Sequence, residues 1–270
     1  MATLNTLAKA GRVLDLFRPE RAEWGVSEVA EELGVPRSSA HALLSSLADV
    51  GILQWRDGGR YRVGWRVLEL AEVRRGTIDI RAAAAPVLER LVRTYGETCH
   101  LGVRDRDQVL YVDKLLGNHN ITAQGAPVGA RLDLHCTGVG KVLLAHAGDL
   151  ARYLGAVPLR RHTPATVTDE RAFRAELAEI RSRGAGFDLG EAVEDVFCVA
   201  APVRDDLGHV VAALSLSAPV NRFTKNRDRY TRAIRAAAAE VSRAVVDSAP
   251  VHRGVNRDDP PPRRPSAPPR

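Results

Sequence analysis

Residues 36–53, PRSSAHALLSSLADVGIL, combine an apolar stripe with hydroxyl, imidazole and guanidinium groups that could contact nucleic acid. On a helix that turns by about 100° per residue, the apolar face carries Ala40, Leu43, Leu44 and Leu47. The small polar residues point away from that face, where they allow close approach to another surface. Hydroxyl and imidazole groups can hydrogen-bond base edges in the major groove, and the free N–H groups of a helix start suit a phosphate. The candidate DNA contacts here are Arg37, Ser38, Ser39 and His41.

A shorter helix before this segment and a hairpin after it predict a winged helix-turn-helix domain. We expect Ser27 to cap the shorter helix, which ends at Gly34, and we include Ser27 among the DNA contacts. ILQWRDGGRYRVG predicts two short strands around residues 57–59, which would form the wing. The candidate phosphate or minor-groove contacts of the wing are Arg56, Arg60 and Arg62. The alternative is a small helical bundle whose polar face is only solvated.

A second group of residues could bind a small anion. HCTGVGKVLLA begins a helix at Gly138 and Val139, where free N–H groups and the helix dipole favour a carboxylate. The alternative is an ordinary glycine-rich helix start. AALSLSAP places Ser215 and Ser217 on one face of a strand, where the two hydroxyls would meet either a polar ligand or solvent.

Two further residues belong to the same candidate site. Cys198 lies in VFCVAAP on the strand face of Val196 and Ala200, where a free cysteine can also simply pack. Asp188 lies in GFDLGE, which we expect to be a loop. Asp188 therefore either caps this loop or accepts a hydrogen bond from a donor group of the ligand.

The sequence does not favour catalysis or a metal. His135 and Cys136 are neighbours, so their side chains would point apart in a strand, which does not suit a nucleophile and its base. Cys99 and His100 have the same problem. The three cysteines are widely separated, and no local spacing supports metal ligation, although histidines and cysteines could still meet in space. We therefore expect no enzyme activity, no cofactor and no metal ligands.

The elements that must position these residues form an α/β (α+β) fold. We expect helices over residues 4–18, 66–75, 78–96, 138–147 and 226–247, and one capped by Thr168 and ended by Gly184. Strands are expected over residues 99–105, 108–116, 196–205 and 209–219. The predicted domains are a DNA-binding domain (1–65), a linker helix (66–78), an effector-binding domain (79–247) and a disordered Pro/Arg-rich tail (248–270).

Composition narrows the class of protein. The chain lacks both a run of about 18 apolar residues and a secretion signal, so we expect a cytoplasmic protein that does not contact a membrane. The net charge of +6 permits a nucleic-acid partner without requiring one, because residues 248–270 alone contribute five arginines against two aspartates, a net +3.

These motifs together resemble the IclR family of bacterial transcriptional regulators over nearly all of residues 4–247. The resemblance rests on VSEVAEELGVPRSSAHALLSSLADVGIL, YRVG, LHCTGVGKVLLA and GFDLGEAVEDVFCVAAPVRDDLGHVVAALSLSAPVNRF. It implies a winged helix-turn-helix domain, a linker helix and a GAF-like effector domain that binds small organic or aromatic acids.

The resemblance also implies which residues line the effector site. Carried over by position, they are Ile121, Gln124, Leu132, Gly138, Val139, Asp188, Val196, Cys198, Ser215 and Ser217. Two positions depart from the family's pattern. Ala42 stands where an arginine commonly follows the histidine of the recognition helix, and Gln124 stands where related sites are often apolar. One phosphate or base contact is therefore either absent or supplied by the wing, and we expect the ligand to carry an extra polar group if Gln124 faces inward.

We therefore predict a homo-oligomeric transcriptional regulator, a dimer or a dimer of dimers, that binds a double-stranded DNA operator and responds to a small-molecule effector. The linker residues Leu68, Leu70 and Val73 are candidates for the dimer contact. Two alternatives remain: an enzyme acting on a small acid, with Asp188 and Cys198 as its titratable pair, and a constitutive repressor without a ligand.

Overall fold

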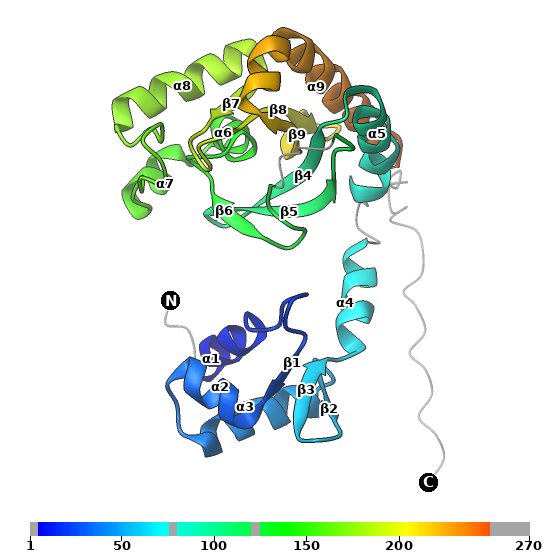
Figure 1. Ribbon diagram of the computed structural model, residues 1–270, viewed down its shortest axis with the longest axis vertical. Helices are drawn as coiled ribbons and strands as arrows, with labels where there is room; N and C mark the ends of the chain where they lie inside the picture. Colours follow the sequence, from blue (N-terminus) through cyan, green and yellow to red (C-terminus); the bar gives the residue numbers. More distant parts are fainter. Residues whose placement is uncertain (1–4, 76–79, 120–124, 249–270) are drawn as a thin grey trace, which may run out of the picture. The chain divides into compact units, whose positions relative to one another are not determined.

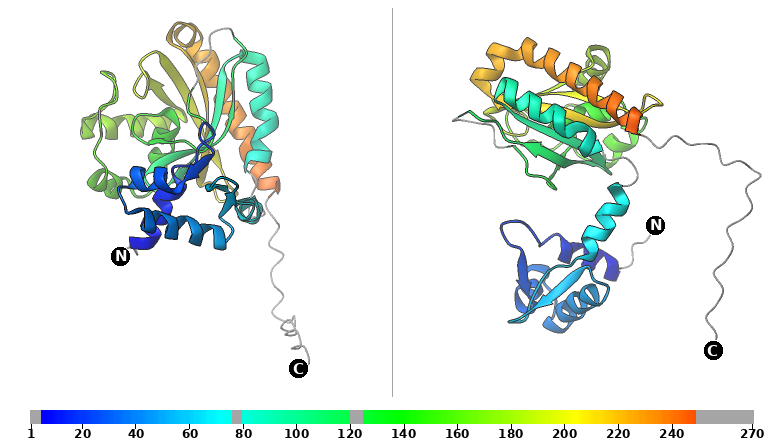
Figure 2. Two further views of the ribbon diagram at one scale, coloured as in Figure 1. Left: turned by 60° about the horizontal axis from the view of Figure 1, so that its bottom comes forward. Right: turned by 90° about the vertical axis from the view of Figure 1, so that its right-hand side faces the viewer.

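The chain divides into two compact units, residues 1–78 and 79–270. The structure is a computed structural model and describes residues 5–75, 80–119 and 125–248 (Figures 1 and 2). The tail predicted for residues 248–270 therefore lies, after Ser248, outside the described residues. None of the helices described is both long enough and apolar enough to cross a membrane.

The first unit packs three helices against a small antiparallel sheet. Its elements are α1 (Asn5–Leu14), β1 (Glu23–Gly25), α2 (Val26–Leu33), α3 (Arg37–Asp49), β2 (Leu53–Arg56), β3 (Arg60–Val63) and α4 (Arg66–Arg75). The sheet order is β1-β3-β2, so the predicted hairpin gains a third strand that the sequence did not reveal. Val13, Ala40 and Leu44 are fully buried in one core, which confirms the predicted inward face of the 36–49 helix.

Helix α2 starts two residues earlier than expected, and Ser27 is not its cap. The N-cap is Gly25, whose N–H donates to Glu28 Oε2 at 2.7 Å. A glutamate in the first turn can accept this bond from the residue before the helix, so a serine cap is not needed. The predicted end of the helix is confirmed, because Gly34 has φ 64° and takes the left-handed conformation that glycine accepts without a Cβ penalty.

The second unit is built around a six-stranded antiparallel sheet of order β6-β5-β4-β9-β8-β7. Its strands are β4 (Thr98–Asp105), β5 (Gln108–Leu115), β6 (Arg131–Asp133), β7 (Gly186–Leu189), β8 (Val196–Arg204) and β9 (Val210–Pro219). Its helices are α5 (Ile80–Tyr95), α6 (Gly138–Ala145), α7 (Leu150–Ala156), α8 (Glu170–Arg183) and α9 (Val220–Ser248).

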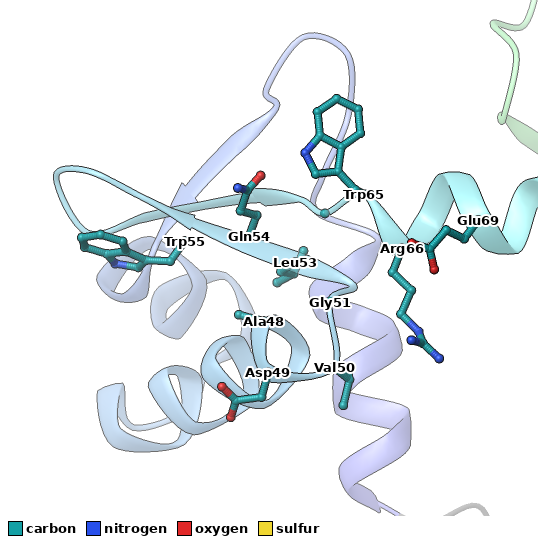
Figure 3. A pocket seen from close by; sticks show the side chains of 11 residues that line it. Ala48, Asp49, Val50, Gly51, Leu53, Gln54, Trp55, Trp65, Arg66 and Glu69 are labelled. Atoms are coloured by element: carbon teal, nitrogen blue, oxygen red, sulfur yellow. The ribbon is translucent and has the colours of Figure 1, made fainter.

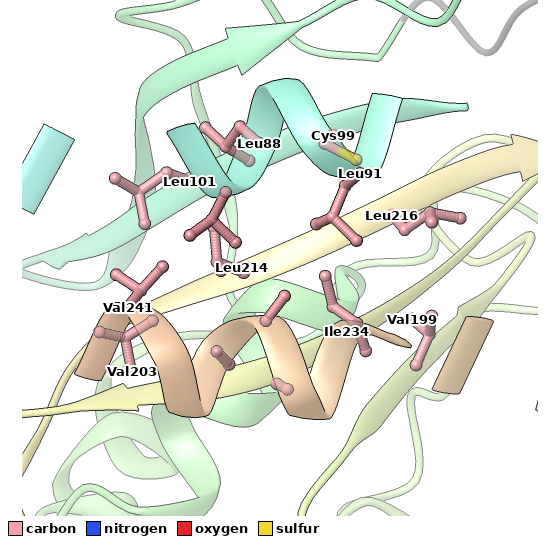
Figure 4. Close-up of a cluster of buried hydrophobic side chains, with 14 of the residues drawn as sticks. Leu88, Leu91, Cys99, Leu101, Val199, Val203, Leu214, Leu216, Ile234 and Val241 are labelled. Atoms are coloured by element: carbon pink, nitrogen blue, oxygen red, sulfur yellow. The ribbon is translucent and has the colours of Figure 1, made fainter. Parts of the chain in front are cut away.

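Helices cover both faces of this sheet (Figures 1 and 2). On one face, α5 and α9 bury a core that contains Leu88, Leu214 and Ile234 (Figure 4). On the other face, α6 packs against the sheet and α8 packs on α6, around Leu143, Phe173 and Leu177. Successive side chains of a strand point to opposite faces of the sheet, so β4 and β9 each contribute residues both to the α5/α9 core and to the face covered by α6.

Several expectations for this unit are corrected. Thr168 does not cap α8, because the side chain of Asp169 accepts the N–H of Ala172 at 2.8 Å and is the N-cap. GFDLGE is not wholly a loop: Asp188 lies on β7, an edge strand paired with β8. Helix α9 begins directly after β9, six residues before the expected start at position 226, and α7 was not expected.

A buried ion pair joins the start of β4 to the last helix. Glu97 is fully buried, and its carboxylate accepts both Arg222 Nε and Arg222 Nη2, at 2.7 and 2.9 Å. Tyr230 donates its hydroxyl to the same carboxylate at 3.0 Å. A buried carboxylate with this many donors is well compensated, so its removal takes away the acceptor of the Tyr230 hydroxyl and two hydrogen bonds of the Arg222 guanidinium.

We expect Glu97→Ala to destabilise the protein by about 2–4 kcal/mol, the lower end allowing for the partial exposure of Arg222. Urea unfolding followed by circular dichroism measures the change. Glu179→Ala is the matched control, because Glu179 is exposed in a loose pair with Arg183 and should change stability by less than about 0.5 kcal/mol. Equal stability of the two variants would contradict the role assigned to Glu97.

Candidate DNA-binding surface and effector site

Helix α3 presents a polar surface opposite its buried leucines. Arg37, Ser38 and His41 are exposed, and Ser39 is half-buried near the start of the helix. Ser27, on the preceding helix α2, is also exposed. The exposed side chains therefore offer a guanidinium, hydroxyls and an imidazole beside a helix N-terminus, groups suited to phosphates and base edges.

The three wing arginines lie in different environments. Arg56 is exposed at the end of β2. Arg60 is bound to groups of its own domain, since its Nη2 donates to the carbonyl of Glu23 at 2.9 Å and pairs with Glu28 Oε2 at 3.1 Å. Arg62 donates from Nε and Nη2 to Gln54 Oε1, at 3.3 and 3.1 Å. The partners of Arg60 and Arg62 shape the wing, while Arg56 is the arginine offered to solvent.

An open pocket of about 600 Å³ lies where the wing meets α4 (Figure 3). Its lining residues are Ala48, Asp49, Val50, Gly51, Leu53, Gln54, Trp55, Gly64, Trp65, Arg66 and Glu69. None of them is among the predicted DNA or effector residues, and the pocket belongs entirely to the first unit.

In the second unit, strand register gathers most of the predicted effector residues on one face of the sheet. Asp188 lies opposite Cys198, Cys198 opposite Ser217, and Ser217 opposite Thr98, which makes one polar row across β7, β8, β9 and β4. Side chains directly opposite each other in a sheet share a face. Residues far apart in the chain therefore meet beneath α6.

The next row on the same face contains Ala200, Ser215, His100 and Lys114. Ser215 and Ser217 are 2% and 6% exposed, so the alternative of a solvent-facing serine face is wrong. Their neighbours Leu214 and Leu216 point into the α5/α9 core, as the alternation predicted.

The start of α6 lies directly against this face. A Cβ on Gly138 would come within 2.8 Å of Cys198 Sγ, so only glycine lets the helix start approach the sulfur. Val139 packs over Gly102 of β4, where a Cβ would meet Val139 Cγ1 at 2.7 Å. Thr137 caps the helix by accepting the N–H of Gly140 at 3.0 Å. These contacts bring the first N–H groups of α6 to the polar rows.

A buried cation joins α6 to the loop that follows β7. Lys141 is fully buried, and its Nζ donates to Glu176 Oε1 at 2.6 Å and also to Glu191. Asp188 Oδ1 accepts the N–H of Glu191 at 2.6 Å, which fixes the turn after β7. Desolvation of Lys141 is offset only because both carboxylates surround it.

Burial controls the charge states of these groups. It raises the pKa of Asp188 to about 7, with the Glu191 charge adding to the effect and hydrogen bonds from Glu191 and Ala192 opposing it. Burial also raises the pKa of the Cys198 thiol, which therefore stays protonated. A protonated, buried thiol is a poor nucleophile, so the Asp188–Cys198 pair does not resemble a catalytic pair.

His100 is a residue of this site that the sequence analysis did not select. It is 3% exposed, its Nε2 has no hydrogen-bond partner among the described residues, and its ring lies 5.2 Å from that of Tyr111. Burial, with Lys114 contributing, lowers the pKa of His100 to about 4, so the ring is neutral. The two-residue periodicity of strand β4 could have indicated His100, because it sends His100 to the face opposite Cys99 and Leu101.

The remaining predicted effector residues are less central or cannot be placed. Leu132 lies on β6 opposite Val109 and packs on the α6 side of the sheet, and Val196 is half-buried at the start of β8. Ile121 and Gln124 lie outside the described residues. His135 and Cys136 lie in a turn, not in a strand, so the argument that their side chains point apart is wrong. Cys99 and His100 do lie on a strand and do point apart.

Comparison with known proteins decides the family. Residues 6–57 match the family model described as the IclR helix-turn-helix domain. Residues 75–243 match the model described as the bacterial transcriptional regulator IclR C-terminal domain. The chain belongs to the IclR family of bacterial transcriptional regulators. It is a DNA-binding regulator with a winged helix-turn-helix domain and an α/β effector domain, and the hypothesis of an enzyme is wrong.

Relatives and solved structures cover most of the chain. The HTH-type transcriptional regulator XynR of Escherichia coli is 34% identical over 225 residues, 82% of this chain and 89% of that protein. BhcR of Paracoccus denitrificans is 34% identical over 88% of this chain and 86% of its own length. The crystal structure of an IclR homologue from Microbacterium hydrocarbonoxydans, complexed with 4-hydroxybenzoate, superposes with a TM-score of 0.78 at 31% identity. The superposition covers 89% of this chain and 99% of the Microbacterium chain.

The raised pKa of Asp188 predicts a pH dependence of stability. Because the folded-state pKa lies above the unfolded value, this carboxyl stabilises the fold below about pH 4, and that contribution is lost as the pH rises through about 7. Asp188→Asn stays neutral, so its stability relative to wild type should increase between about pH 4 and pH 7, by at most about 1.4 kcal/mol per pH unit. Urea unfolding at several pH values measures this difference.

The control for this series is Asp206→Asn, since Asp206 is an exposed aspartate in a turn. Its stability relative to wild type should stay level over the same range. A level difference for Asp188→Asn as well would show that Asp188 is ionised in the folded protein throughout.

Proposed function

We propose that this regulator binds its operator through α3 and the wing, and that a small organic acid held between α6 and the sheet modulates this binding. The observation that carries the effector half is that buried polar side chains on one face of the sheet, among them His100, Ser215 and Ser217, lie beneath the first turn of α6. We further propose that the protein acts in the cytoplasm, where an operator and a metabolite are both accessible.

The environment of each side chain ranks the proposed DNA contacts. Arg37 is exposed at the first residue of α3, and Arg56 is exposed on the wing, so both guanidinium groups are available to phosphates. Ser38, Ser39 and His41 would read base edges from the first turns of α3. Arg60 and Arg62 would act mainly by holding the wing in shape, because acceptors of their own domain already engage them.

The chemistry of the polar rows favours a carboxylate. The first N–H groups of α6 and the hydroxyls of Ser215 and Ser217 are all able to donate. The helix dipole adds a partial positive charge at Gly138 and Val139. The homologue from Microbacterium hydrocarbonoxydans binds 4-hydroxybenzoate, a carboxylate that also carries a hydroxyl. His100 Nε2, buried without a described partner, would suit such a second polar group.

Oligomerisation would allow the effector to change operator binding, because it joins two DNA-binding domains in one assembly. Leu68 and Leu70 on α4 are 56% and 51% exposed, which leaves apolar surface on the helix that follows the wing. We expect a second copy of the chain to cover this surface, so that two recognition helices enter successive major grooves of a pseudo-palindromic operator. Leu68→Lys should then shift the protein toward monomers in analytical ultracentrifugation.

The recognition-helix assignment predicts different losses for two substitutions. Arg37→Ala should weaken operator binding about fivefold to tenfold and reduce the slope of log affinity against log salt by about one, because one phosphate contact is lost. Ser39→Ala should instead lower discrimination between operator and unrelated DNA, by about 1–3 kcal/mol. Gel shifts on the DNA upstream of the regulator's own gene, at several salt concentrations, measure both.

Ser46→Ala is the matched control for this experiment. Ser46 is an exposed serine of the same helix but lies more than one turn beyond the proposed contacts, so its removal should leave affinity unchanged. If Arg37→Ala and Ser39→Ala also retain wild-type affinity and salt dependence, α3 is not the recognition helix.

The effector assignment is tested with a panel of aromatic and aliphatic carboxylates that includes 4-hydroxybenzoate. At least one acid should raise the melting temperature of wild type and change its operator affinity by about 5- to 150-fold. Gly138→Ala and Ser217→Ala should lose both responses, since one crowds Cys198 and the other removes a buried hydroxyl. Ser182→Ala, an exposed serine on α8, should keep them.

Two outcomes would contradict this proposal. If no acid of the panel acts on wild type, the protein is a constitutive regulator with respect to this class of ligand. If an acid acts equally on wild type and both site variants, the effector binds elsewhere in the protein.

A further inference from the structure

Two histidines and a cysteine meet beside the start of α6, in a cluster that the effector proposal does not use. His135 and Cys136 lie in the turn between β6 and α6, and His162 lies in the loop between α7 and α8. One nitrogen from each histidine and the sulfur of Cys136 all lie within 4.8 Å of one another. His135 and Cys136 are buried, whereas His162 is exposed, so the cluster can be reached from solvent.

The hydrogen bond of His135 determines which of its nitrogens is free. Its Nε2 lies 2.8 Å from the carbonyl oxygen of Arg160. A carbonyl oxygen only accepts, so Nε2 carries the hydrogen and Nδ1 keeps its lone pair in a neutral ring. Nδ1 is buried and has no hydrogen-bond partner among the described residues. A histidine whose second ring nitrogen donates to a carbonyl is the arrangement found at metal ligands.

The other two donors are held by their surroundings. His162 Nε2 lies 3.0 Å from Asp133 Oδ2, and the rings of His135 and His162 are 5.7 Å apart. Cys136 Sγ donates to the Asp133 carbonyl at 3.7 Å. The loop of His162 is anchored next to it, because Thr163 Oγ1 donates to the carbonyl of Gly190 at 2.6 Å.

We propose that His135 Nδ1, Cys136 Sγ and His162 bind a divalent transition metal ion of the zinc class. Two imidazole nitrogens and a thiolate are ligands that zinc prefers, and magnesium and calcium, which take oxygen ligands, are disfavoured. On binding, the thiol loses its proton to solvent and the thiolate bonds to the metal. The fourth position is left for water or for the Asp133 carboxylate.

The required movement is small. Zn–N bonds of about 2.0–2.1 Å and Zn–S bonds of about 2.3 Å place tetrahedral donors roughly 3.3–3.6 Å apart. Donors that already lie within 4.8 Å of one another must approach by no more than about 1.5 Å to reach this separation, and the exposed His162 is the member with the most room to move. Because Cys136 directly precedes the Thr137 cap, the metal would tie the His162 loop to the turn that begins α6.

The experiment uses the tag-free, full-length protein after dialysis against a chelator. Reloading with zinc should give one ion per chain by mass spectrometry, and His162→Asn should weaken zinc binding at least about 100-fold. Cobalt(II) is the spectroscopic probe: wild type should show a sulfur-to-cobalt charge-transfer band that Cys136→Ser lacks. His162→Asn changes an exposed loop residue, so folding is expected to survive even if Cys136→Ser misfolds.

Matched controls separate this site from other histidines and cysteines. Cys99→Ser removes another buried cysteine and His209→Asn another exposed histidine, and both variants should keep one zinc ion and the charge-transfer band. The proposal is overturned if dialysed wild type takes up no zinc at micromolar free metal. It is equally overturned if His162→Asn and Cys136→Ser bind zinc as wild type does. Neither result affects the proposed DNA or effector contacts.

Discussion

The buried ammonium of Lys141 is the interaction on which the effector domain most depends. A lone buried charge would cost several kcal/mol, so Lys141 is tolerated only with Glu176 of α8 and Glu191 beside it. These three charges hold α6, α8 and the turn after β7 in one arrangement. Asp188 accepts the backbone N–H of Glu191, so the same network also orients the end of the polar row. A group that altered one of these charges would act on all three elements together.

The sheet places the polar side chains of the proposed effector site next to these elements. Strict alternation along β4 and β9 sends Leu101 and Leu214 to the α5/α9 core and sends His100 and Ser215 to the α6 side. Apolar packing on one face thereby supports polar groups on the other. A rigid core fixes the strands, and the glycine start of α6 can then approach them closely at Gly138. Binding chemistry and stability are in this way divided between the two faces of one sheet.

Features with a strong local cause were predictable from the sequence. The inward leucines of α3, the hairpin at residues 57–59 and the Ser215/Ser217 face all follow from periodicity or turn chemistry. Helix caps were less predictable, because a nearby carboxylate can take the place of the expected capping residue, as Asp169 does for Thr168. The strand at Asp188 was missed because a four-residue segment that begins with Gly186 and is followed by Gly190 looks like a turn, and only pairing with β8 makes it a strand. Contacts between loops, such as those of His162, have no signal in local sequence.

The close approach of Gly138 to Cys198 has a consequence for redox behaviour. The sulfur is covered by the helix start, and burial raises the pKa of its thiol. Peroxide attacks the thiolate form of cysteine, and it needs access to the sulfur. Cys198 therefore has neither the ionisation nor the exposure of an oxidant sensor. The effector domain can therefore hold this thiol beside its proposed ligand site without the thiol being oxidised by peroxide.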